Sequence, residues 1–177
     1  MPFGRNRVIL ALPMPAVGHV LVVCTANICR SPMAAALLRH ALAAQPEPLR
    51  SLPVISAGVS ARSGERMTEH SITALKKAGI DATRHSSQLL TQEMLDRAVL
   101  ALCMTESHRN MIEATAHPQP KNLHLFRDFM APGERHEIAD PYGGPLQIYE
   151  ITRDEMVEAI PSLIAHLKTR IAPRERS

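Results

Sequence analysis

The stretch VLVVCTANICRSPMAAALL, residues 20–38, indicates the fold more clearly than any other part of the sequence. Its apolar run from Val20 to Val23 is typical of a strand that is buried on both faces. Ser31-Pro32 then opens a run rich in Ala and Leu. Ser is a good N-cap and Pro is favoured at the first helical position, so this pair favours a helix start. We therefore expect a strand, a short loop and a helix in direct succession.

The rest of the chain repeats this alternation of short apolar strands with helices. We expect strands at 54–56, 98–104 and 123–126, and helical spacing at 105–114. Thr68 is predicted to cap a helix that ends at Gly79. A last helix follows the loop 132–145, and Pro161 is expected to kink or split it. This order predicts a three-layer α/β/α sandwich with a four-stranded parallel sheet, in which ligands gather at the carboxyl ends of the strands.

Composition narrows the class of protein. The 177 residues carry a formal net charge of +3, which is compatible with anionic substrates. Aromatic residues make up 3% of the chain and Trp is absent, which argues against a stacking platform for nucleic acid. Three cysteines, an odd number, do not form a disulfide framework, so we expect a reducing, cytoplasmic compartment. The sequence has no apolar stretch long enough to cross a bilayer.

The N-terminal residues precede the first expected strand. The apolar run 8–12 follows two arginines, but Pro13 and Pro15 interrupt the apolar pattern and argue against a secretion signal. We expect residues 1–17 to be a disordered extension, with Met1 and Met14 as alternative starts, and residues 18–172 to form the domain. The default expectation for the oligomeric state is a monomer.

The segment from Cys24 to Ser31 carries the chemistry. A tight loop between a strand end and a helix start points backbone N–H groups inward, which makes a nest for a tetrahedral anion. The helix dipole and a nearby guanidinium both favour Cys24 as a nucleophilic thiolate. Arg30 can bind two phosphate oxygens bidentately, and Ser31 can donate a hydrogen bond to the thiolate. An isolated Cys would more often be a buried structural thiol, but this spacing favours the nucleophile.

These residues resemble the low-molecular-weight protein tyrosine phosphatase family, bacterial type, whose signature is a Cys, five residues, then Arg-Ser after the first strand. Segments 55–58, 79–85, 102–107 and 140–142 also resemble the family, so the resemblance covers about residues 18–170. It implies hydrolysis of protein phosphotyrosine through a phosphocysteine, with neither metal nor cofactor. It also implies that Asp140 is the general acid. An aryl phosphate needs a general acid, because the phenol has a pKa of about 10 and would leave as a poorly stabilised phenolate unless it receives a proton.

The same resemblance implies supporting roles. Asn27 would hold the phosphate loop in a left-handed conformation, with Ser56 and His85 in its hydrogen-bond network. Ala26 stands where the family commonly has Gly, and we expect ordinary backbone angles there. Cys29 either forms a protective disulfide with the nucleophile or packs the loop. The remaining candidates are the loop residues Thr25 and Ile28 and, at the rim of the pocket, Tyr142 and Arg62, with Ser60 and Ala61 nearby.

The substrate and the reaction leave alternatives. The loop 140–144 resembles bacterial members that include phosphoarginine phosphatases, which carry Thr where Ile28 stands. An apolar Ile28 suits an aryl ring, so we expect phosphotyrosine, with a protein-arginine phosphatase as the alternative. A non-catalytic phosphotyrosine-binding module is a further alternative. A thioredoxin-coupled arsenate reductase would need an additional redox pair of cysteines further along the chain, and only Cys103 lies there, which argues against this reading. A metal site is disfavoured as well, because Cys24 and Cys29 lack two further Cys or His ligands at a recognisable spacing. The expected partners are phosphotyrosine proteins, with a bacterial tyrosine kinase suggested by analogy, and neither nucleic acid nor a membrane.

Overall fold

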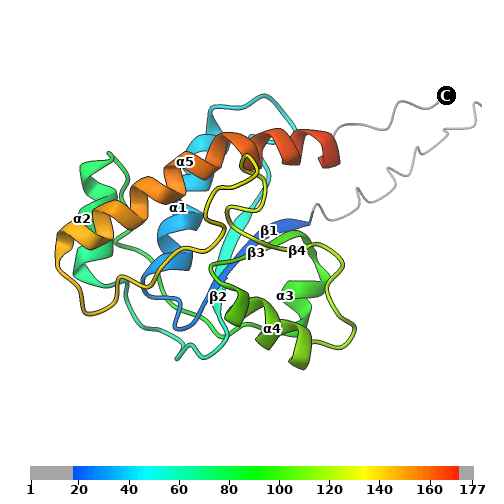
Figure 1. Ribbon diagram of the computed structural model, residues 1–177, viewed down its shortest axis with the longest axis horizontal. Helices are drawn as coiled ribbons and strands as arrows, with labels where there is room; N and C mark the ends of the chain where they lie inside the picture. The colour runs from blue at the N-terminus through cyan, green and yellow to red at the C-terminus, as the bar shows by residue number, and fades with distance from the viewer. Residues whose placement is uncertain (1–17, 172–177) are drawn as a thin grey trace, which may run out of the picture.

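The computed structural model describes residues 18–171, and Figure 1 shows their arrangement. A parallel sheet has the strand order β2-β1-β3-β4. This confirms the predicted four-stranded parallel sheet, while the expectation for residues 1–17 concerns a segment outside the described range. The elements in chain order are β1 (His19–Cys24), α1 (Arg30–Ala43), β2 (Val54–Gly58), α2 (Glu69–Lys77), α3 (Gln92–Asp96), β3 (Ala98–Cys103), α4 (Glu106–Thr115), β4 (Leu123–Leu125) and α5 (Leu146–Ile171).

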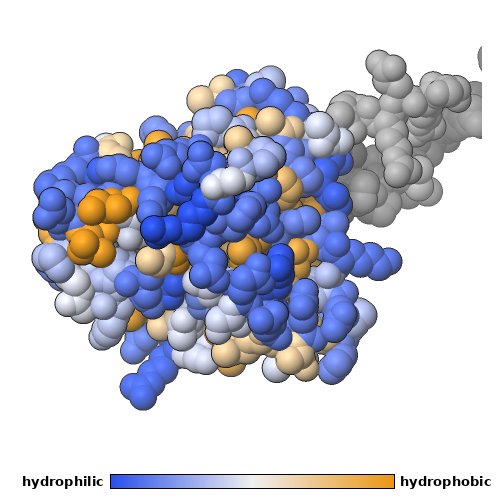
Figure 2. All heavy atoms as spheres, in the orientation of Figure 1, coloured by the Kyte–Doolittle hydropathy of each residue, from blue (hydrophilic) through white to orange (hydrophobic). Residues whose placement is uncertain are grey.

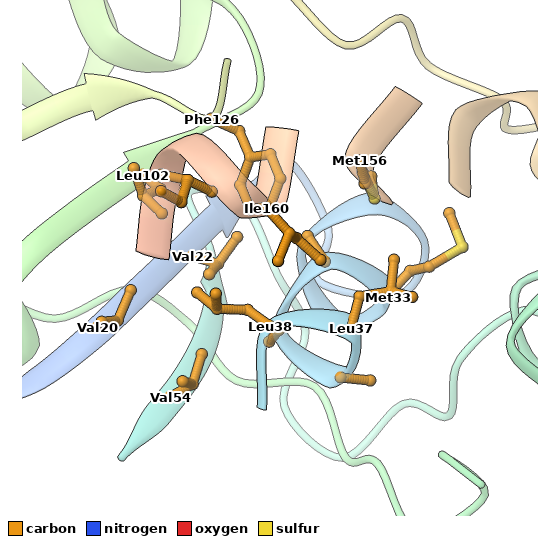
Figure 3. Packing of buried hydrophobic residues seen from close by; sticks show 14 of the residues in the cluster. Val20, Val22, Met33, Leu37, Leu38, Val54, Leu102, Phe126, Met156 and Ile160 are labelled. Atoms are coloured by element: carbon orange, nitrogen blue, oxygen red, sulfur yellow. The ribbon is translucent and has the colours of Figure 1, made fainter. Parts of the chain in front are cut away.

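Helices cover both faces of the sheet, which gives the predicted three layers. Along β1, Val20 and Val22 belong to the core beneath α1 and α5, as Figure 3 shows for part of that core. Leu21 and Val23 belong to a second core on the opposite face, beneath α3 and α4. Side chains alternate between the faces of a strand, so the continuous apolar run from Val20 to Val23 can fill both cores.

The ends of the helices follow capping chemistry. Thr68 accepts a hydrogen bond from the backbone N–H of Ser71, which confirms it as the N-cap of α2. Gly79 lies just beyond α2 with a φ of 77°, a left-handed conformation that glycine adopts without strain. Thr105 caps α4 in the same way as Thr68, through the N–H of His108. Short polar side chains and one glycine therefore set these helix boundaries.

The structure differs from the sequence prediction at three helices. First, α1 begins at Arg30, so Cys29 holds the N-cap position without a side-chain cap, and Ser31 instead turns towards Cys24. Second, α5 is one continuous helix, so Pro161 does not split it, and the alternative of a kink stays a prediction. This helix packs against α1 and α2, and that tertiary packing offsets the loss of one backbone hydrogen bond. Third, α3 was not predicted, because a helix of five residues is too short to show periodicity.

The face of the molecule seen in Figure 2 is mainly polar. Figure 2 shows a largely hydrophilic face with an apolar group of atoms over the region where α2 and α5 lie side by side. No helix within residues 18–171 is both long enough and apolar enough to cross a membrane.

Candidate active site

The segment that joins β1 to α1 lies at the carboxyl end of the sheet. Cys24 ends β1 and Arg30 begins α1, so the loop between them contains residues 25–29. Ligands of parallel α/β sheets bind at this edge. A pocket of about 250 Å³ lies there, and it is lined by Cys24, Thr25, Ala26, Ile28, Cys29, Arg30, Asp140 and Tyr142. A larger hollow beside α4 and the segment 135–139 contains none of the predicted catalytic residues.

Most carbonyl groups of this loop are hydrogen-bonded to the rest of the protein, whereas its N–H groups are not bonded to any described residue. Four carbonyl oxygens between Cys24 and Ile28 accept hydrogen bonds from residues outside that stretch, whereas no hydrogen bond between described residues uses an N–H of residues 25–30 as its donor. Backbone donors inside a protein are rarely left without a partner, so these N–H groups are suited to an anion in the pocket. The accepting carbonyls belong to Cys24, Thr25, Asn27 and Ile28, and their donors are Val59, Ser60, His85 and Thr68, in that order.

Asn27 is the centre of the network that holds the loop. It is fully buried, and its φ of 58° confirms the predicted left-handed conformation. Its side-chain Nδ2 donates to Ser31 Oγ at 2.8 Å and to Ser56 Oγ at 2.9 Å, while its Oδ1 accepts from the N–H of Gln88 at 3.0 Å. His85 Nε2 donates to the Asn27 carbonyl at 2.7 Å, so Nε2 must carry the ring proton. The structure thus brings Ser56 and His85 to the loop, together with Gln88, which sequence reasoning missed.

One glycine allows the loop to lie against β2, and Ala26 imposes no unusual backbone angles on the loop. Among the described residues other than glycine, only Asn27 has a positive φ, so Ala26 adopts ordinary backbone angles, as predicted. A Cβ atom on Gly58 would lie 2.5 Å from the carbonyl oxygen of Thr25 and 2.9 Å from the backbone nitrogen of Asn27. Any side chain at position 58 would therefore push the loop away from the sheet.

The sulfur of Cys24 lies 3.0 Å from Ser31 Oγ, and both residues are buried. Ser31 Oγ also lies 3.2 Å from the carbonyl oxygen of Ala57. A hydroxyl has one proton, so Ser31 can give it to Ala57 when Cys24 is a thiol and to Cys24 when it is a thiolate. With these two acceptors in reach, the Ser31 hydroxyl can donate its hydrogen bond to the sulfur whenever the sulfur is negatively charged.

Arg30 and Asp140 form an ion pair at the pocket. Arg30 Nη2 donates to Asp140 Oδ2 at 2.5 Å, and Nη1 donates to the carbonyl oxygen of Ile138 at 3.2 Å. The third nitrogen of the guanidinium, Nε, is buried and has no partner within residues 18–171. Asp140 Oδ1 accepts from the N–H of Tyr142 at 3.1 Å, which shapes the turn that holds the carboxylate. The side chain of Arg30 is 5% exposed and that of Asp140 is 49% exposed, so the carboxylate faces the open side of the pocket.

His108 is a buried neighbour of the loop that sequence reasoning missed. Its Nε2 lies 2.9 Å from Thr25 Oγ1, and its Nδ1 lies 2.8 Å from Thr105 Oγ1. Burial, reinforced by the positive charge of Arg30, lowers the pKa of His108 to about 4, so the ring is neutral at physiological pH. The only sequence cue was its position directly after the segment 102–107, which resembles the family.

The remaining candidates lie in different places. Ile28 and Tyr142 line the pocket, and Tyr142 is 69% exposed at its mouth. Arg62 is exposed and is not among the lining residues, so its place at the rim stays a prediction.

Cys29 Sγ lies near Thr68 Oγ1 and the Tyr149 hydroxyl, and burial raises the pKa of its thiol. Both Cys24 and Cys29 are free thiols here, so a regulatory disulfide also stays a prediction. Within residues 18–171, no group of three or more His, Cys, Asp or Glu side chains could hold a metal ion.

A cysteine, an arginine and a carboxylate line one pocket at the carboxyl end of a parallel sheet, and this set of groups fits the class of enzymes that act on phosphate monoesters through a cysteine. The sequence model of the family described as low molecular weight phosphotyrosine protein phosphatase matches residues 19–172, and the chain belongs to this family. This confirms the predicted family and the predicted enzyme class, a protein phosphatase.

Individual relatives carry two kinds of name. A protein-arginine-phosphatase from Geobacillus stearothermophilus is 40% identical over 151 residues, which cover 85% of this chain and 97% of the relative. A probable low molecular weight protein-tyrosine-phosphatase EpsP from Ralstonia solanacearum is 39% identical over 131 residues, which cover 74% and 83%. The solved structure of the YwlE arginine phosphatase from Geobacillus stearothermophilus matches with a TM-score of 0.78 at 36% identity, covering 90% of this chain and 99% of that one.

Proposed function

We propose that the protein hydrolyses phosphotyrosine in proteins, with Cys24 as nucleophile, Arg30 as phosphate clamp and Asp140 as general acid. The observation that carries this proposal is the pocket itself, because these three residues line it together. The apolar wall from Ile28 and the aromatic Tyr142 at the mouth suit a planar ring above the phosphate. Membership of a phosphotyrosine phosphatase family supports the same reaction.

In the first step, the Cys24 thiolate attacks phosphorus in line with the bond to the leaving oxygen. The S–P bond forms, the P–O bond to the phenol breaks, and Asp140 gives its proton to the phenolic oxygen. The loop N–H groups and the Nε of Arg30, which have no partner within residues 18–171, stabilise the equatorial oxygens of the transition state. These donors are already in place, so little reorganisation is needed when charge develops.

In the second step, water hydrolyses the phosphocysteine. Asp140, now a carboxylate, accepts a proton from the attacking water, whose oxygen forms a bond to phosphorus as the S–P bond breaks. The departing thiolate receives a hydrogen bond from Ser31, whose hydroxyl lies 3.0 Å from the sulfur. The cycle ends with inorganic phosphate and a regenerated thiolate.

A protein-arginine phosphatase is the second candidate, because a relative of that name is 40% identical to this chain. The two substrates differ in the group to which the phosphoryl group is bonded. The guanidinium of phosphoarginine carries N–H donors that need acceptors, whereas a phenyl ring needs an apolar surface. Ile28 offers no acceptor, so the wall that it forms favours the ring. We therefore expect Ile28→Thr to raise activity on phosphoarginine relative to phosphotyrosine.

The test compares wild type with Cys24→Ser in hydrolysis of para-nitrophenyl phosphate near pH 6, with chelator and reductant present. Cys103→Ser is the matched control, because Cys103 is also buried but lies in β3 and does not line the pocket. We expect turnover in wild type and the control, and none in Cys24→Ser. Phosphotyrosine and phosphoarginine peptides then decide the substrate. Turnover that survives in Cys24→Ser would exclude the proposed nucleophile, and an inert wild type would favour a phosphate-binding module.

The biological setting extends the same proposal. The substrates would be tyrosine-phosphorylated proteins in the cytoplasm, and a bacterial tyrosine kinase is the expected source of them. The name of the EpsP relative refers to a tyrosine phosphatase, which supports this substrate class. Residues 18–172 would form the catalytic domain and act as a monomer.

A further inference from the structure

The chain Thr105–His108–Thr25 connects the N-terminus of α4 to the phosphate loop. Both nitrogens of His108 are within hydrogen-bond distance of a hydroxyl, Thr25 Oγ1 at 2.9 Å and Thr105 Oγ1 at 2.8 Å. His108 is 5% exposed, whereas Thr25 is exposed and lines the pocket. The buried imidazole thus contacts a side chain that a bound substrate would meet.

The N-cap of α4 favours one direction for these hydrogen bonds, although each contact of His108 alone is compatible with either tautomer. Thr105 Oγ1 accepts the backbone N–H of His108 as the N-cap of α4, so its own proton remains to be donated. We assign that proton to His108 Nδ1, the side-chain acceptor within its reach among the described residues. A neutral imidazole that accepts at Nδ1 must carry its proton on Nε2, so Nε2 donates to Thr25 Oγ1. The hydroxyl proton of Thr25 is then not used by His108.

We propose that Thr25 donates a hydrogen bond from its hydroxyl to an oxygen of the bound phosphoryl group, and that His108 is the positioning residue that makes this proton available. Thr25 directly follows the nucleophile and lines the same pocket. With the opposite tautomer, Thr25 would donate to His108 and could offer the substrate only an acceptor, which an anion repels. This inference rests on the proposed phosphate site and adds a further donor to it.

The first measurement is the tautomer of His108 in the full chain, from the ¹⁵N chemical shifts of its ring nitrogens by nuclear magnetic resonance. We expect a neutral ring with the proton on Nε2 at pH 7. A proton on Nδ1 would overturn the proposal. The Nε2 tautomer is a necessary condition for the proposal, and the affinity measurements that follow separate positioning from packing.

The second measurement is the affinity of the reduced protein for inorganic phosphate, by calorimetry. A hydrogen bond to a charged oxygen gives an expected loss of about tenfold for Thr25→Val, whereas Thr25→Ser keeps the hydroxyl and should stay within about threefold. Equal affinities for the Val and Ser variants would overturn the proposal. Wild type that binds phosphate as expected but does not hydrolyse phosphotyrosine would reject the proposed function while leaving this inference intact.

Substitutions at His108 test the positioning role. His108→Leu should weaken phosphate binding when Thr25 is present and have little further effect in Thr25→Val, while His108→Gln, which keeps a donor, should restore part of the affinity. Additive losses would show that His108 does not act through Thr25. Thermal unfolding of each variant identifies those that fold. If His108→Leu does not fold, the Thr25 variants and the tautomer of the wild type still decide the question.

Discussion

Replacing Asn27 with Ala should destabilise the protein far more than the loss of an ordinary loop side chain. The substitution removes three side-chain hydrogen bonds, to Ser31, Ser56 and the N–H of Gln88. At about 1 kcal/mol each, these contribute roughly 3 kcal/mol to the free energy of unfolding. Alanine at a φ of 58° adds about 1 kcal/mol of backbone strain. The expected loss is therefore about 4 kcal/mol.

Urea denaturation at pH 7, monitored by circular dichroism, measures this loss. With a slope of about 2 kcal/mol per molar urea for a domain of this size, the midpoint should fall by roughly 2 M. Ser56→Ala is the matched control, because it removes one of the same hydrogen bonds and should lower the midpoint by about 0.5 M. If Asn27→Ala proves no less stable than Ser56→Ala, Asn27 does not hold the loop.

Three further predictions concern the same loop. Gly58→Ala should lower both stability and phosphate affinity, because its Cβ would lie 2.5 Å from the Thr25 carbonyl oxygen. Gly79→Ala is the control, because position 79 has a positive φ but open space around it, and this variant should lower stability alone. Calorimetric titration with phosphate compares the affinities of the two variants. Arg30→Lys should reduce kcat/KM with para-nitrophenyl phosphate by about 100-fold or more, roughly 3 kcal/mol, because an ammonium cannot replace the bidentate guanidinium, and near-normal turnover would contradict this. An ordinary histidine has a pKa of 6.5, whereas the pKa of His108 is about 4 in the folded protein. Between these values the unfolded state binds more protons, so the free energy of unfolding falls as the pH drops through them, by up to about 3 kcal/mol. His108→Gln should flatten this decline between about pH 7 and 4.5 in urea titrations, and an unchanged slope would refute it.

Much of the fold could be predicted from local patterns. Apolar runs marked all four strands, and Thr68 and Gly79 marked both ends of α2. The last helix shows the limit of such patterns. Ile148, Ile151 and Val157 are apolar residues of this helix, yet these three side chains are between 41% and 49% exposed. The buried face instead includes Tyr149 and Met156, because packing against α1 and α2 sets the rotation of a helix that periodicity alone leaves open.

The site divides in the same way. The phosphate loop and its flanks are contiguous in the sequence, so Cys24, Arg30 and Ser31 were readable from spacing, whereas the role of Asn27 was implied by the family resemblance. Gln88 and His108 contribute from segments that are 61 and 83 residues away from their partners in the loop. Neither lies in a motif with chemistry of its own, and a lone Gln or His is usually an ordinary surface residue. Only the packing of distant segments around the loop gives them a role.

The loop is therefore held from two sides before any substrate arrives. Ser56 of β2 and the segment that contains His85 and Gln88 fix Asn27 on one side, and His108 of α4 contacts Thr25 on the other. Arg30 completes the arrangement, because it holds Asp140 through one nitrogen while its Nε stays unpartnered among the described residues. A phosphate that binds Arg30 would compete with Asp140 for that shared guanidinium. Binding of the substrate would thus favour release of the carboxyl group from Arg30, which frees Asp140 for the proton transfer of the proposed mechanism.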